Sequence, residues 1–284
     1  MIRIAVCQID IALGNIQANH EKVTDILSLA AGEGAELVVF PELSLCGYQF
    51  DDFETVRKNA LAETSPVITS LDDHCRKLGL IAAIGFIEND DGETYNTVGV
   101  FGVSGHFPRY RKVHLPAFGA DRFLLKGNMG FSVIDLSFVR LGINICYDQR
   151  FPESARSLAI LGAQLIVVPT SETMAMQEIT DVLIKARAYE NRVFYAWANR
   201  VGTENGSLYT GLSKIVNPWG EVITQASIDQ EDIIFAEIDL AIADQKEMVI
   251  ELGEVEMDLM KDRMPQYYTA ITESRKEDPD TESR

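Results

Sequence analysis

The 284-residue chain is poor in the residues that build disulfide frameworks and metal centres. It has four cysteines and four histidines, and neither type occurs at the spacing of a common metal motif. Cys7, Cys46, Cys75 and Cys146 are widely spaced and accompany no secretory signal, so we expect reduced thiols. We expect no metal, and no glycine-rich motif indicates a nucleotide or flavin cofactor.

Basic residues are also scarce, because 25 Lys and Arg face 43 Asp and Glu, for a net charge of −18. This sign disfavours phosphate backbones and anionic membranes as partners. No apolar run approaches the roughly 18 residues of a membrane span. The N-terminal apolar run is short and lacks a small-residue cleavage site, so a cytoplasmic location is expected.

Strand and helix patterns alternate along the chain, which is typical of an α/β protein. Strands are predicted at 2–9, 37–40, 80–88, 94–103, 131–136, 139–146, 165–168, 193–200, 209–217, 221–226 and 232–238. Helices are predicted at 18–33, 65–78, 152–161 and 176–190.

An internal repeat accompanies this alternation. The segment GAELVVFP at 34–41 returns as GAQLIVVP at 162–169, an offset of 128 residues. The strands before these segments, IRIAVCQID and VRLGINICYD, are also alike. Two related layers packed face to face explain the repeat, although two generic βαβ units would share Val- and Ile-rich strands as well. In this register Glu42 corresponds to Thr170, so the halves carry different chemistry.

No linker rich in Pro, Gly or Ser divides the chain, which predicts a single domain over residues 1–271. Residues 272–284 are charged and almost devoid of apolar side chains, so a disordered tail is expected there.

Cys146 is the first catalytic candidate, because it follows the apolar strand LGINI and precedes a helix. A helix N-terminus favours a thiolate, and the backbone N–H groups of such a turn can bind an oxyanion. A cysteine at a strand end can equally be a small buried hydrophobe.

Glu42 and Lys112 are two further candidates. Glu42 directly follows a buried strand and Pro41, where a carboxylate in a dry cleft would suit a general base. Lys112 lies in RYRKVHLP, where a lysine in a cleft could stabilise an oxyanion. Taken singly, each residue could also be an ordinary loop or surface charge.

Three motifs, FPELSLCGY (40–48), RKVHLP (111–116) and INICYDQRFPE (143–153), together resemble the nitrilase superfamily of carbon–nitrogen hydrolases. The resemblance covers roughly residues 2–240 and implies an α-β-β-α sandwich, in agreement with the repeat. It also implies a catalytic triad of Glu42, Lys112 and Cys146, with the backbone N–H of Tyr147 in the oxyanion site. Homodimers or larger homo-oligomers are common in the family.

One departure concerns a second glutamate, which the family commonly carries in a stretch of the type Glu-x-x-x-Phe-x-x-Gly. Counting back from Gly127 places Ala120 at that position, and Asp121 is one residue away. Either Asp121 takes the role through a local shift, or the site works without it. We favour Asp121.

The run CYDQRFPE looks like the amidase and N-carbamoyl-amine branches. It favours hydrolysis of a small amide or N-carbamoyl amine through a Cys thioester, with release of ammonia or an amine. Nitrile hydrolysis and a non-catalytic binding protein of the same fold are the alternatives. Arg150 could hold an acidic substrate or pair with Glu153 at the helix start. The pocket candidates are Tyr48, Phe118, Arg150, Ser171 and Glu172.

Overall fold

The computed structural model describes residues 1–273, and these divide into a large unit, Met1–Gln245, and a second unit that begins at Lys246. The large unit ends earlier than the boundary at residue 271 that the sequence predicted. The reason is that residues 246–273 contain no buried hydrophobic side chain. Most of the tail predicted at 272–284, namely residues 274–284, lies outside the described residues.

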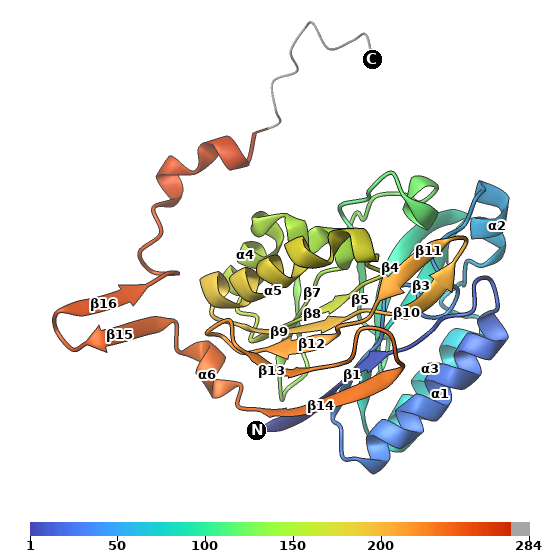
Figure 1. Ribbon diagram of the computed structural model, residues 1–284, viewed down its shortest axis with the longest axis horizontal. Coiled ribbons are helices and arrows are strands. Elements are labelled where there is room, and N and C mark those ends of the chain that lie inside the picture. The colour runs from blue at the N-terminus through green and yellow to red at the C-terminus, as the bar shows by residue number, and fades with distance from the viewer. Residues whose placement is uncertain (274–284) are drawn as a thin grey trace, which may run out of the picture. The chain divides into compact units, whose positions relative to one another are not determined.

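Two six-stranded sheets form the centre of the large unit (Figure 1). The first contains, in spatial order, β14 (Asp232–Ile238), β1 (Ile2–Gln8), β2 (Leu37–Val39), β3 (Ile81–Asp90), β4 (Glu93–Phe101) and β5 (Arg109–Arg111). The second contains β6 (Val133–Asp135), β7 (Arg140–Ile143), β8 (Leu165–Pro169), β9 (Phe194–Ala198), β12 (Lys214–Val216) and β13 (Val222–Gln225).

The two sheets have the same pattern of strand directions. In each, an antiparallel edge pair is followed by two parallel pairs and two antiparallel pairs. The registers also agree, since Ile4 pairs with Leu37 and Leu141 pairs with Leu165 at equivalent positions. The internal repeat is therefore confirmed, because two unrelated βαβ units would not share all five pairings.

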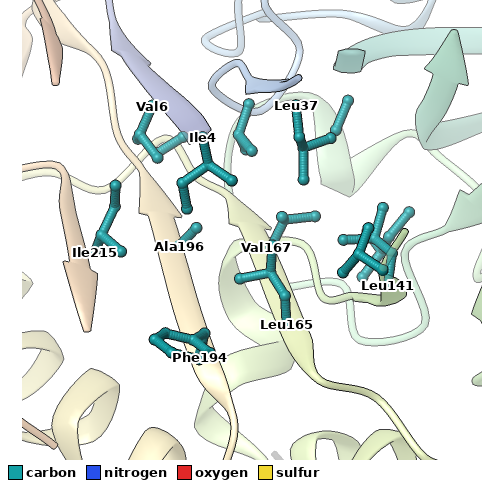
Figure 2. Packing of buried hydrophobic residues seen from close by; sticks show 14 of the residues in the cluster. Ile4, Val6, Leu37, Leu141, Leu165, Val167, Phe194, Ala196 and Ile215 are labelled. Atoms are coloured by element: carbon teal, nitrogen blue, oxygen red, sulfur yellow. The ribbon is translucent and has the colours of Figure 1, made fainter. Parts of the chain in front are cut away.

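A hydrophobic core lies between the sheets (Figure 2). Ile4 and Val6 of β1 and Leu37 of β2 face Val167 of β8 and Ala196 of β9. Alternate residues of these strands point away from this core. Both faces of each sheet are thus buried, which explains the nearly continuous apolar strands of the sequence.

Helices cover the two outer faces (Figure 1). They are α1 (Ile16–Gly32) and α3 (Pro66–Leu78) on the first sheet, and α4 (Pro152–Ile160) and α5 (Gln177–Asn191) on the second. Helix α3 shows the local signals well, with Ser65 as N-cap, Pro66 in the first turn and Gly79 left-handed at the end. The predicted α-β-β-α sandwich is confirmed.

Some elements differ from the sequence prediction. The strand expected at 209–217 is broken into β11 (Ser207–Thr210) and β12, because Gly211 and Leu212 are left-handed, with φ of 40° and 57°. Strand β10 (Val201–Glu204), which pairs with β11, was not predicted, nor were β5 and the short helix α2 (Phe53–Lys58). Helix α6 (Ala241–Asp244) closes the large unit.

The second unit contains one antiparallel hairpin, β15 (Glu247–Glu251) with β16 (Val255–Asp258). Two 3-10 turns follow it, η4 (Pro265–Tyr267) and η5 (Thr269–Ile271). Among the residues that the structure describes, no helix has the length and apolar character needed to cross a membrane.

Candidate active site

The candidate catalytic residues lie on loops that follow strands of both sheets. Glu42 is the third residue after β2, and Lys112 directly follows β5. Cys146 begins a 3-10 turn, η2 (Cys146–Arg150), just beyond β7. Cys146 has a positive φ of 43°, and Leu43, next to Glu42, has one of 47°. Non-glycine residues rarely adopt this conformation, which often marks a functional site.

Lys112 lies between two carboxylates. Its Nζ donates to Glu42 Oε1 at 2.6 Å and to Asp121 Oδ2 at 2.5 Å, and none of the three side chains is exposed. Asn96 of β4 connects the same carboxylates, because its Nδ2 donates to Glu42 Oε1 at 2.8 Å and to Asp121 Oδ1 at 2.9 Å. Glu42 Oε2 is buried and has no hydrogen-bond partner among the described residues.

Tyr48 belongs to this polar cluster as well as to the pocket wall. Its hydroxyl donates to Asp121 Oδ2 at 2.7 Å, and its ring lies 5.7 Å from Lys112 Nζ. Asp121 sits in the 3-10 turn η1 (Gly119–Arg122), where Ala120 donates its backbone N–H to the Tyr48 carbonyl. The structure thus brings Asp121 rather than Ala120 to Lys112.

The opposite charges of Lys112 and its two carboxylate neighbours shift the pKa values within the cluster. Burial raises the pKa of Glu42 above its ordinary value, and the nearby ammonium of Lys112 opposes this rise. Burial alone would lower the pKa of Lys112, but Asp121 and Glu42 outweigh it and hold the pKa well above 10.5. Lys112 is therefore a permanent cation in the pH range of most enzymes.

Cys146 is partly exposed, whereas Cys7, Cys46 and Cys75 are buried. Burial of the sulfur and the charge of Glu42 raise the pKa of Cys146 well above 9.0, although Lys112 acts in the opposite direction. The sequence suggested that a helix N-terminus would favour a thiolate at this position. The pKa shift runs against that expectation, because desolvation and the carboxylate favour the protonated thiol.

The turn that carries Cys146 is fixed by Asp148, which the sequence did not single out. Asp148 Oδ2 accepts from the Ile145 backbone N–H at 3.0 Å and from the Tyr110 hydroxyl at 2.8 Å. Its Oδ1 accepts from the His114 backbone N–H at 3.0 Å. One buried carboxylate thereby connects the cysteine turn to the loop that follows Lys112.

A cavity of about 300 Å³ opens at Cys146. Each pocket candidate from the sequence lines it, as does Tyr147. The full set is Tyr48, Pro116, Phe118, Cys146, Tyr147, Arg150, Ser171, Glu172, Thr173, Ala175 and Met176. Glu42, Lys112 and Asp121 do not line the cavity and have fully buried side chains; Asp121 accepts from the Tyr48 hydroxyl of the wall, and the charges of Glu42 and Lys112 act on Cys146.

Arg150 pairs with Glu172, at 2.8 Å between Nη2 and Oε1, and among the described residues it forms no ion pair with Glu153. Ser171 donates its hydroxyl to the Glu42 carbonyl at 3.2 Å, which ties the second half of the chain to the first. The ten predicted site residues therefore gather at one place. Among the described residues, no group of three or more His, Cys, Asp and Glu side chains could hold a metal ion.

Asn96 and Asp148 are the polar residues that the sequence analysis missed. Asn96 is an isolated amide within a buried apolar strand, TYNTVGV, and a buried amide of this kind needs polar partners. A buried amide therefore indicates that polar partners lie nearby, but it does not identify them. Asp148 stands two residues after the nucleophile candidate in a motif that was quoted, yet its side-chain partners come from distant segments.

Comparisons with known proteins agree with this geometry. The family model of the carbon–nitrogen hydrolases matches residues 3–246. A protein named nitrilase from Pyrococcus abyssi is 36% identical over 94% of this chain and 99% of its own length. Omega-amidase NIT2 from Danio rerio is 33% identical over 87% of this chain and 92% of its own. The amidase from Nesterenkonia sp. AN1 shares the fold, with a TM-score of 0.81, 24% identity and coverage of 95% of this chain and 100% of its own.

Proposed function

The chain belongs to the carbon–nitrogen hydrolase family and is an enzyme acting on carbon–nitrogen bonds other than peptide bonds, and we propose that it hydrolyses a small amide or N-carbamoyl amine through a Cys146 thioester. One observation carries the proposal. Lys112 Nζ lies 2.6 Å from Glu42 Oε1 and 2.5 Å from Asp121 Oδ2, Glu42 Oε2 has no hydrogen-bond partner among the described residues, and the charge of Glu42 raises the pKa of Cys146.

Acylation begins with the transfer of the Cys146 proton to Glu42 Oε2. A base is needed, because the raised pKa of Cys146 keeps the sulfur protonated at neutral pH. The raised pKa of Glu42 makes its carboxylate a better proton acceptor than an exposed one. The sulfur then attacks the carbonyl carbon of the substrate.

The carbonyl oxygen becomes an oxyanion, which Lys112 Nζ and the backbone N–H of Tyr147 stabilise. Lys112 suits this role because Asp121 and Glu42 hold it in place and keep it charged. Removing one oxyanion donor typically costs about 3 kcal/mol, or more than a hundredfold in rate. Asp121 acts here as a positioning residue for Lys112.

The tetrahedral adduct collapses when Glu42 returns its proton to the leaving nitrogen, so the carbon–nitrogen bond breaks and ammonia or an amine departs. Water then gives a proton to Glu42 and its oxygen to the thioester carbon, and the carbon–sulfur bond breaks as Glu42 returns that proton to the Cys146 sulfur. The products are a carboxylic or carbamic acid and the free thiol. One acid–base residue therefore serves both steps.

The test is a screen for released ammonia over small primary amides, N-carbamoyl amines and nitriles. Cys146→Ala should abolish turnover with an unchanged circular dichroism spectrum, and Glu42→Gln should lower kcat by at least a hundredfold. Cys75→Ala, which removes a thiol outside the site, is the matched control and should keep its activity.

Each outcome decides one point. Turnover by purified Cys146→Ala would show that another group is the nucleophile. Activity on nitriles alone would replace the amide proposal with a nitrilase, the name carried by the relative from Pyrococcus abyssi. The non-catalytic alternative is set aside by the family membership.

We also propose that the chain forms a homodimer or a larger homo-oligomer. Support comes from apolar side chains of the second unit, among which Ile250 is 73% exposed and Leu252 is 85% exposed. Exposed apolar surface of this kind often marks an interface between proteins. Light scattering would give the mass, and a single-chain mass would contradict the proposal.

A further inference from the structure

The charges that line the cavity at Cys146 bear on the substrate. Of the eleven lining residues, only Arg150 is basic and only Glu172 has a carboxyl group. The others are aromatic, aliphatic or neutral polar residues. Arg150 is the one cation of this wall, so it is the group on which an acidic acyl chain would depend.

Glu172 already forms an ion pair with Arg150. Arg150 Nη2 donates to Glu172 Oε1 at 2.8 Å, and the Thr180 hydroxyl donates to the same oxygen at 2.6 Å. Gln149 Nε2 lies 3.4 Å from Oε2. Three donors around a carboxyl group favour its ionised form, and they oppose the rise in the pKa of Glu172 that burial causes.

Glu172 cannot easily turn away to release Arg150. Its backbone N–H donates to Asn199 Oδ1 at 2.8 Å, and its carbonyl accepts from Asn199 Nδ2 at 3.2 Å. Only 5% of the Glu172 residue is exposed. Since both its backbone and its side chain are held, an anionic ligand would have to compete with a preorganised carboxylate for Arg150.

The groups behind the wall add to this effect. Lys112 is shared by Glu42 and Asp121, and together with the Arg150–Glu172 pair the site contains three carboxylates and two cations. The chain as a whole has a net charge of −18. An anionic substrate therefore approaches a negative protein and reaches a site with negative charge in excess.

We propose that the acyl group of the substrate is short and uncharged, and that Glu172 is the specificity residue that excludes acyl chains ending in a carboxylate. This inference rests on the proposed amide hydrolysis at Cys146. The cavity of about 300 Å³ limits the length of the chain, because it lies at the small end of ligand sites. The apolar wall binds the chain, and the neutralised arginine offers no anion site.

Two amides of nearly equal shape test the charge alone. Succinamate ends in a carboxylate, and 4-methylpentanamide ends in an isopropyl group of similar size. The wild-type enzyme should hydrolyse 4-methylpentanamide with a kcat/KM at least tenfold above that for succinamate. Measurements of released ammonia at low ionic strength and neutral pH keep the charges unscreened.

Glu172→Gln removes the charge of Glu172 but keeps its size and its capacity to accept from Arg150. It should raise the ratio of kcat/KM for succinamate to kcat/KM for 4-methylpentanamide at least tenfold. Adding Arg150→Met to Glu172→Gln should remove the gain. Glu153→Gln is the matched control, because it removes an exposed carboxylate three residues from Arg150 that does not contact it.

The outcomes separate this inference from the proposed function. A wild-type preference for succinamate would overturn the inference and leave amide hydrolysis intact. Glu172→Gln without a gain on succinamate would overturn the role of Glu172. Failure of the wild type on both amides, at the level of the Cys146→Ala blank, would instead count against the proposed amide hydrolysis.

Discussion

Replacing Asp121 with asparagine tests the least expected residue of the site. Three donors converge on the Asp121 carboxylate: Lys112 Nζ and the Tyr48 hydroxyl on Oδ2, and Asn96 Nδ2 on Oδ1. An asparagine offers one oxygen and an NH₂ group, which is itself a donor. If its oxygen faces Lys112, its NH₂ group faces Asn96 Nδ2, so at least one buried contact becomes repulsive.

The magnitude follows from the burial of the pair, since neither Lys112 nor Asp121 exposes any side-chain surface. Removing one partner of a buried ion pair typically destabilises a protein by about 3–5 kcal/mol. Glu42 still faces Lys112, so we take the lower figure, ~3 kcal/mol. For a domain of this size that is a fall in Tm of about 6–12 °C. The same loss of Lys112 positioning in the transition state would lower kcat about a hundredfold.

Thermal unfolding and steady-state ammonia release measure the two effects in one preparation. Asp73→Asn, which removes an exposed carboxylate from α3, is the matched control and should shift neither quantity appreciably. The reasoning is refuted if Asp121→Asn keeps kcat within threefold of the wild type, because Lys112 would then need only Glu42 to hold it.

Three further predictions concern the same cluster. Tyr48→Phe removes a hydrogen bond to the Asp121 carboxylate and should lower kcat about tenfold, with KM nearly unchanged. Because burial raises the pKa of Glu42, kcat/KM should fall as the pH drops through a midpoint above 4.5. The raised pKa of Lys112 predicts no loss of kcat/KM up to pH 9. A fall of kcat/KM on the alkaline side near neutral pH would contradict this. Iodoacetamide should label one thiol of the native protein, as mass spectrometry would show, and Cys146→Ala should prevent the labelling.

The sandwich could be predicted from the sequence because burial on both faces leaves a clear pattern. Strands such as β2 and β8 are continuous apolar runs, and each follows a Gly-Ala turn and ends near a proline. The break between β11 and β12 left no such signal. It depends on a left-handed Leu212, a conformation that leucine does not favour by itself and that the surrounding structure imposes.

The sequence alone could predict those site residues that come just after a buried strand, such as Glu42 and Cys146. Lys112 could be recognised only through the family motif, because a lysine that follows Arg109 and Arg111 looks like a surface charge. Counting back from Gly127 pointed to Ala120, because the count assumes the residue spacing of the family's motif. Here Gly119 has a φ of 51°, and a Cβ on it would lie 2.4 Å from the Tyr48 ring, so the turn that carries Asp121 passes too close to Tyr48 for a side chain at this position.

The internal repeat explains why neither half of the chain could contain this site alone. In the pairing of β1 with β2 and of β7 with β8, the position of Glu42 corresponds to Thr170, and that of Cys146 corresponds to Ile9. In the proposed mechanism one half therefore supplies the acid–base group and the other the nucleophile. The equivalent positions in the opposite halves hold Thr170 and Ile9, which have no acid–base chemistry. The two halves meet at these positions, since the Glu42 backbone N–H donates to the Thr170 carbonyl at 3.4 Å. In the proposed mechanism the core between the sheets thus has a catalytic task besides stability, because it holds the two sheets whose strand ends carry Glu42 and Cys146 against each other.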